Sequence, residues 1–92
     1  MIEYRDENPT RCWSVTTIQG DIVEAWPVAA SAEEAMGVAV FAIHEILGNN
    51  YILRPPAALT GGDKWLITAE PTIHGYPEIK PVEAYILPTT FR

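Results

Sequence analysis

The stretch SAEEAMGVAVFAIHEILGNN, residues 31–50, decides the fold because it predicts one helix with both ends marked. Ser31, followed by Glu34 three positions later, forms the capping-box pattern that satisfies free N–H groups of the first helical turn. Glu33 and Glu34 also suit the positive end of the helix dipole. The closing run Gly48-Asn49-Asn50 tolerates the left-handed conformation that commonly follows a last turn.

The expected helix has two different faces at 100° per residue. The apolar face, which we expect to lie on a sheet, comprises Ala32, Ala35, Met36, Ala39, Ile43, Ile46 and Leu47. The opposite face comprises Glu33, Glu34, Gly37, Phe41, His44 and Glu45. Of these residues, only Phe41 is unsuited to contact with water. Gly37 lies one turn before Phe41 and leaves a flat spot on the helix surface, at a cost of about 1 kcal/mol in helix stability relative to Ala. Either the N-terminal residues or the proline-rich C-terminal half covers Phe41, or Phe41 contacts another molecule.

A β-hairpin is predicted ahead of the helix. Its strands, Cys12–Ile18 and Ile22–Val28, are rich in β-branched and aromatic side chains. Gln19-Gly20 is typical of a two-residue turn, which would place Trp13 opposite Trp26. Pro27 has no N–H to donate, so the second strand is expected at an edge of the sheet.

Further strands are predicted after the helix, which gives the order β-β-α-β-β-β. The expected segments are a strand at 50–53 broken by Pro55-Pro56, a turn at 60–63, a strand at 64–70, a loop at 71–77 and a last strand at 82–87 between Pro81 and Pro88. The prolines are expected to protect an edge from unwanted pairing. The predicted fold is therefore a two-layer α+β domain, with an antiparallel sheet and one helix. Residues 1–92 form a single domain in this interpretation, with 1–11 as a polar lead-in.

Composition narrows the possible functions. The chain has 92 residues and a formal net charge of −6, from 12 acidic and 6 basic side chains. A scattered and scarce set of bases argues against nucleic-acid binding, which needs a basic surface. No apolar run approaches the roughly 20 residues of a membrane-spanning helix. The polar start and the lone Cys12 fit a cytoplasmic protein. No direct sequence-specific nucleic-acid binding and no membrane contact are expected.

Catalytic, metal and cofactor signals are weak. Cys12 with His44 or His74 could form a nucleophile–base pair, but no third group is marked in the sequence. Metal-ligand spacings are missing around the two histidines. The run Gly61-Gly62-Asp63-Lys64 lacks the rest of a phosphate-binding loop and is typical of a hairpin turn. We therefore expect no enzyme activity, no cofactor and no metal, with a small enzyme using Cys12 as the rival hypothesis.

The surface most suited to a partner combines an aromatic ring with acids. The candidate partner-binding residues are Phe41, Gly37, Glu34, His44 and Glu45 on the helix and Tyr76 in the loop His74-Gly75-Tyr76-Pro77. Aromatic side chains are typical binding hot spots. The negative charge favours a protein or nucleoprotein complex with a basic surface as the partner.

Two families are similar to this sequence in different ways. The small size, acidity, α+β pattern and lack of catalytic motifs resemble the anti-CRISPR proteins of bacteriophages, in general character over the whole chain and without a shared motif. That resemblance implies an inhibitor that binds a CRISPR effector complex and blocks target DNA. The hairpin followed by Ser31-Ala32-Glu33-Glu34-Ala35 looks like the antitoxin domain of the HicB family, although the DNA-binding segment common in that family is missing from these residues. A HicB-like antitoxin or another small regulatory module is the alternative.

Overall fold

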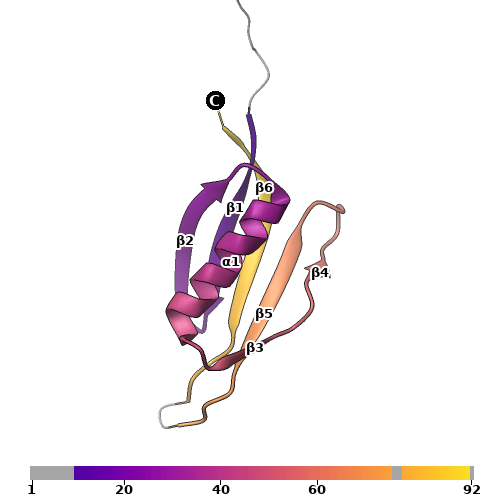
Figure 1. Ribbon diagram of the computed structural model, residues 1–92. Coiled ribbons are helices and arrows are strands. Elements are labelled where there is room, and N and C mark those ends of the chain that lie inside the picture. The colour runs from indigo at the N-terminus through magenta and orange to yellow at the C-terminus, as the bar shows by residue number, and fades with distance from the viewer. Residues whose placement is uncertain (1–9, 76–77, 92) are drawn as a thin grey trace, which may run out of the picture.

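The computed structural model describes residues 10–75 and 78–91 and has the predicted α+β architecture (Figure 1). One helix packs on a six-stranded antiparallel sheet. The elements are β1 (Thr10–Gln19), β2 (Ile22–Ala29), α1 (Ala32–Leu47), β3 (Tyr51–Leu53), β4 (Ala57–Ala58), β5 (Trp65–Pro71) and β6 (Val82–Phe91). The two-residue strand β4 is an addition to the predicted order β-β-α-β-β-β.

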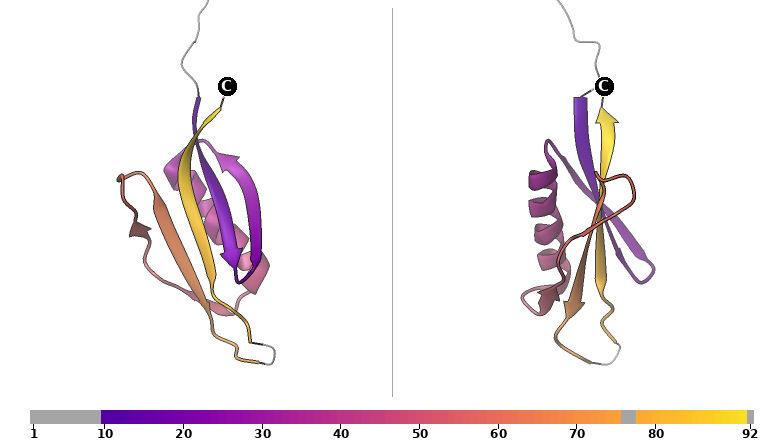
Figure 2. Two further views of the ribbon diagram at one scale, coloured as in Figure 1. Left: turned by 180° about the vertical axis from the view of Figure 1, so that it is seen from behind. Right: turned by 90° about the vertical axis from the view of Figure 1, so that its right-hand side faces the viewer.

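The strands lie in the spatial order β2-β1-β6-β5-β3, and β4 pairs with β5 beyond the end of β3. β6 is thus the strand between β1 and β5, although it is the last of the described strands in the chain. Its pairing with β1 is long, from Thr10 opposite Phe91 to Ile18 opposite Glu83. Figure 2 shows α1 on one side of the sheet and no helix on the other.

The predicted hairpin is confirmed, but its predicted register is wrong by two residues. The turn is Gly20-Asp21, with Gln19 opposite Ile22, and Trp26 lies opposite Val15 instead of Trp13. Gly20 has φ +61°, so the glycine takes the first turn position. A slip of two residues keeps every side chain on the same face, and hydrophobic alternation therefore does not distinguish the two registers.

Two expectations about prolines have opposite outcomes. β2 is an edge strand, as Pro27 predicts. The expectation that Pro88 ends an edge strand is wrong, because β6 is central and continues to Phe91. β5 pairs with β6 only as far as Ile86, so Pro88 lies where β6 has a neighbour on one side alone. A missing N–H is tolerated at such a position.

The core lies between α1 and one face of the sheet. The fully buried helix residues are Ala35, Ala39, Ala42 and Ile43, and the buried sheet residues are Val15, Thr17, Ala29, Ile67, Ala69, Val82, Ala84 and Ile86. The alanines allow the helix to approach the sheet closely. α1 packs mainly over β1, β2 and β6, and its buried arc extends to Ala42, which the predicted apolar face omits.

Both predicted ends of α1 are confirmed. The Ser31 hydroxyl accepts a 3.0 Å hydrogen bond from the Glu34 amide. The Glu34 carboxylate accepts a 3.1 Å bond from the amide of Ala30, one residue before the N-cap. At the other end Gly48 has φ +68° and donates to the His44 carbonyl at 2.8 Å. No helix within residues 10–75 and 78–91 is long and apolar enough to cross a membrane.

Candidate functional site

Phe41 lies on the outer surface of α1 with 58% of its area exposed. We use the name Phe41 face for Glu34, Gly37, Phe41 and Glu45 of α1 together with Trp26 of β2. The proline-rich half of the chain, where it is described, does not cover the Phe41 ring. Residues 1–9, the other cover considered from the sequence, lie outside the described residues. A large exposed ring on a folded helix identifies this face as the candidate binding surface.

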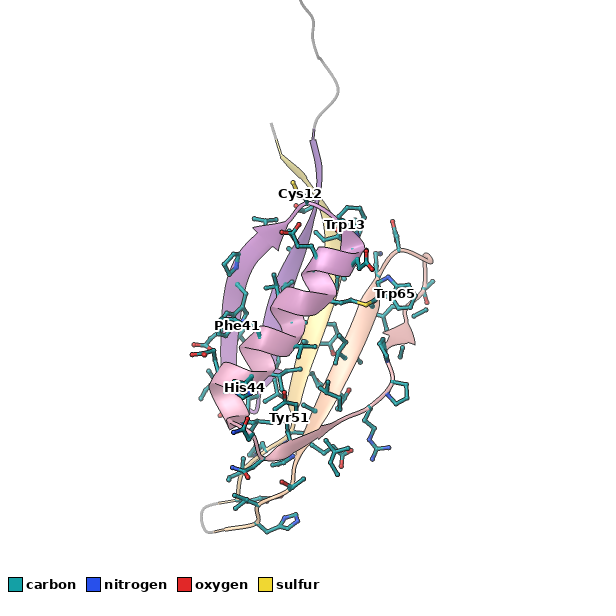
Figure 3. The ribbon with its side chains drawn as sticks, in the orientation of Figure 1. Cys12, Trp13, Phe41, His44, Tyr51 and Trp65 are labelled. Carbon is teal, nitrogen blue, oxygen red and sulfur yellow. The ribbon has the colours of Figure 1, made fainter. Side chains whose placement is uncertain are left out.

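Trp26 supports the Phe41 ring from the neighbouring edge strand. The two ring centroids lie 6.4 Å apart with an interplanar angle of 85°, an edge-to-face arrangement. The Trp26 indole N–H donates a 2.8 Å hydrogen bond to the hydroxyl of Thr17, whose side chain is buried. Figure 3 shows Phe41 on the side of α1 that faces β2. The exposed ring is therefore held in place by a tryptophan that is itself fixed by the core.

Trp26 is the member of this site that sequence reasoning missed. In the sequence analysis Trp26 is placed only in the hairpin, opposite Trp13, and in the structure Trp26 packs partly against the core. Its position on an edge strand leaves the side chain half-buried, within reach of the helix surface. The neighbouring Pro27 could have indicated that Trp26 is only half-buried, because a proline marks its strand as an edge strand.

Gly37 leaves open space beside Phe41. A Cβ atom built on Gly37 would meet no heavy atom within 4 Å. No neighbouring group within the described chain therefore requires a glycine here. The predicted flat spot is present, and it allows another molecule to approach the helix backbone closely.

The charges around the Phe41 face are acidic. Glu24 of β2 and Glu33, Glu34 and Glu45 of α1 are all exposed. The cations whose side chains the structure describes lie elsewhere: Arg54 pairs with Glu70 at 2.6 Å, Lys64 lies in the turn before β5, and the Lys80 side chain lies against Gly20. A cationic partner would find complementary charge on this face.

The remaining predicted site residues do not join this group. His44 is exposed, and its ring packs edge-to-face with Tyr51 at 6.3 Å between centroids and an angle of 77°. This contact directs His44 toward the β3 flank of α1, away from Trp26. Tyr76 lies outside the described residues.

The geometry does not assemble the catalytic pair considered from the sequence. Figure 3 places Cys12 and His44 toward opposite ends of the molecule. Cys12 pairs with Thr89 near the end of β6, whereas His74 follows β5 near the beginning of β6. Among the described residues no group of three or more His, Cys, Asp or Glu side chains could hold a metal ion. The run 61–64 forms the hairpin turn between β4 and β5, as predicted.

A shallow apolar groove of about 420 Å³ lies on the other flank of α1. Its lining residues are Met36, Val40, Leu53, Arg54, Pro55, Pro56 and Ile67. The groove exists because α1 packs mainly over β1, β2 and β6 and makes few contacts with β5. It lies on the same flank as His44 and Tyr51 and is separate from the Phe41 face.

The fold and this surface define a two-layer α+β domain with an exposed aromatic and acidic helix face. No protein-family model, curated protein or solved structure matches this chain. The functional argument therefore depends on the residues of the chain and on their arrangement.

Proposed function

We propose that this chain is a binding protein without chemistry of its own, which uses the Phe41 face to occupy a basic surface of a larger protein or nucleoprotein complex. The exposure of Phe41 on a fixed Trp26 carries this proposal. Burying an aromatic ring against a partner gains apolar contact, and a ring that is already held in place loses little conformational freedom on binding.

The acidic surroundings favour the choice of a basic partner. Glu24, Glu34 and Glu45 lie on the elements that carry the two rings, and the chain as a whole has a net charge of −6. Complementary charge accelerates association, and salt screens the effect over about 10 Å at 0.1 M. A Lys- and Arg-lined nucleic-acid channel is a surface of this kind.

Inhibition of a CRISPR effector complex is the specific case that we propose, on the strength of the resemblance in size, acidity and fold pattern. In that role the acidic Phe41 face would occupy part of the surface that receives target DNA. The chain would then act by stoichiometric occupation, without turnover.

Target-DNA binding by purified CRISPR effector complexes tests this function. We expect the wild-type chain to reduce target-DNA binding by at least one effector type in a gel-shift titration, with less effect as salt is raised. We expect Phe41→Ala to lose this inhibition. Binding of target DNA that is unchanged for every effector type at a large excess of the chain would contradict the specific proposal.

A matched variant separates the Phe41 face from general loss of apolar surface. Ile52 of β3 is 64% exposed and lies at the opposite edge of the sheet, so Ile52→Ala removes a comparably exposed apolar group elsewhere. We expect Ile52→Ala to inhibit as wild type does. Equal losses in the two variants would show that the Phe41 face is not the contact surface. For the charge, Glu45→Lys should weaken inhibition more than Glu70→Lys, since Glu70 lies on β5, which is separated from β2 by β1 and β6.

A further inference from the structure

β2 is the long free edge of the described sheet. It has 8 residues, whereas the other edge consists of β3 with 3 residues and β4 with 2, separated by Arg54 and Pro55-Pro56. A free edge presents unpaired N–H and C=O groups that accept another strand. The side chains of Ile22 and Val23 on this edge are 60% and 63% exposed. β2 therefore combines free backbone groups with exposed apolar side chains.

The register defines which part of β2 is available. A two-residue turn is closed by a hydrogen-bonded pair, here Gln19 and Ile22, and the bonds then alternate along the strand. Glu24 and Trp26 consequently direct their backbone groups toward β1, and Val23 and Ala25 direct theirs outward. Pro27 has no N–H, so the outward row is limited to Ile22–Trp26.

The two faces of this stretch differ in chemistry. Ile22, Glu24 and Trp26 lie on the side of the sheet that carries α1, where Phe41 packs against Trp26. Val23 and Ala25 lie on the other side. A segment that pairs with β2 would place alternate side chains beside Glu24 and beside Val23 and Ala25. Cationic and apolar residues in alternation complement this pattern.

We propose that the partner docks on β2 as an extended basic segment, which adds a strand to the sheet along Ile22–Trp26 while its neighbouring residues contact Phe41. This inference rests on the proposed function, since it names the form in which the partner meets the same surface. Main-chain hydrogen bonds to Val23 and Ala25 hold the segment, and Glu24 selects for a cation beside it.

A second copy of the chain fits this edge less well. Antiparallel pairing of β2 with its own copy about Glu24 would place the two carboxylates directly opposite each other, which is destabilising. Each copy also has a net charge of −6, so association brings like charges together. Charge complementarity therefore favours a basic partner over self-association.

Amide hydrogen exchange with a defined peptide tests the proposal without any knowledge of the natural partner. The probe is a short capped peptide of alternating lysine and valine, and the control is the same peptide with glutamate in place of lysine. We expect the lysine peptide to slow exchange of the Val23 and Ala25 amides several-fold. The amides of Ile22 and Glu24 already face β1 and serve as internal references.

Substitutions at two positions, Ala25 and Glu24, test the geometry and the charge separately. Ala25→Pro removes an outward N–H and should abolish the protection, whereas Ala25→Val retains the N–H and should preserve it. If Ala25→Pro does not fold, as judged by circular dichroism, Glu24→Lys provides the second test. Glu24→Lys leaves the backbone intact, and we expect it to abolish protection by the lysine peptide and to permit protection by the glutamate peptide.

Three results would overturn the inference. These are unchanged exchange of Val23 and Ala25 at saturating lysine peptide, equal protection by both peptides, and protection that rises with protein concentration when no peptide is present, which would identify a second copy as the occupant. Failure here with intact, Phe41-dependent inhibition would leave the proposed function in place. If the lysine peptide protects these amides but the chain inhibits no effector complex, the proposed CRISPR inhibition is contradicted and the proposed strand docking on β2 is supported.

Discussion

The indole N–H of Trp26 donates a 2.8 Å hydrogen bond to the hydroxyl of Thr17, which is only 1% exposed. This bond joins the edge strand β2 to its neighbour β1 beneath α1. It also fixes the ring on which Phe41 rests, 6.4 Å away between centroids. The buried hydroxyl and the exposed ring are thus parts of one connected arrangement.

Thr17→Val should destabilise the protein by about 1–3 kcal/mol, because it leaves a partly buried indole N–H without its acceptor while it keeps the side-chain shape. Urea denaturation followed by tryptophan fluorescence measures the change. Thr16→Val is the matched control, because side chains alternate along a strand and Thr16 therefore lies on the sheet face opposite that of buried Thr17. Equal stability of the two variants would show that the Thr17–Trp26 bond contributes nothing measurable.

Phe41→Ala should lower the free energy of unfolding by no more than about 1.5 kcal/mol, the range of an aromatic pair contact. The ring is 58% exposed, so little core volume is lost. Ile43→Ala, two residues later and fully buried, should cost about 2–5 kcal/mol in the same measurement. A loss for Phe41→Ala as large as that for Ile43→Ala would place Phe41 in the core and contradict its role as a surface residue.

Gly37→Ala should stabilise α1 by up to about 1 kcal/mol, because alanine is the better helix former and the added methyl group meets no neighbour. The same substitution should weaken partner binding if the partner approaches the helix backbone at this flat spot. Thermal unfolding and the gel-shift titration together measure both effects. Gly48→Ala is the contrasting variant, and it should destabilise because Gly48 has φ +68°. Unchanged inhibition by Gly37→Ala would exclude close approach at Gly37.

Ser31→Ala should lower the free energy of unfolding by about 1 kcal/mol, since the Glu34 amide would lose the cap that it now contacts at 3.0 Å. Ser31→Asp should preserve most of the stability, because a carboxylate also caps a helix N-terminus. Urea denaturation of the three proteins provides the measurement. A Ser31→Asp protein as unstable as Ser31→Ala would refute the capping explanation.

The parts of the fold that depend on nearby residues could be predicted from the sequence. The cap connects Ser31 to Glu34, and the C-terminal stop depends on Gly48. The strand predicted at 64–70 places Trp65, Ile67 and Ala69 on one face. Each of these signals lies within a few residues of the structure that it determines. Because they depend on such local signals, the predicted limits of the helix, the fold class and the edge position of β2 are confirmed by the structure.

The register and the exposure of the site depend on distant parts of the chain. Both hairpin registers keep Trp26 on the helix side, so local alternation could not choose Val15 as its partner. The continuation of β6 through Pro88 depends on where β5 ends, which the sequence around Pro88 does not encode. Whether the C-terminal half covers Phe41 depends on where its strands join the sheet. These strands, β3 to β6, lie beyond β1 from the edge strand β2, beside which Phe41 lies.

The position of β6 has a consequence for the order of events during synthesis. β6 emerges from the ribosome after every other described strand, yet it separates β1 from β5 in the finished sheet. Before it emerges, the β1–β2 hairpin with α1 and the β3–β4–β5 segment have no strand to join them. Completion of the domain therefore waits for contacts between the most distant described parts of the chain, a topology associated with slow folding. A nascent chain that lacks β6 would expose the apolar faces of both halves, so we expect chaperones to bind this protein mainly before β6, the last described strand, emerges.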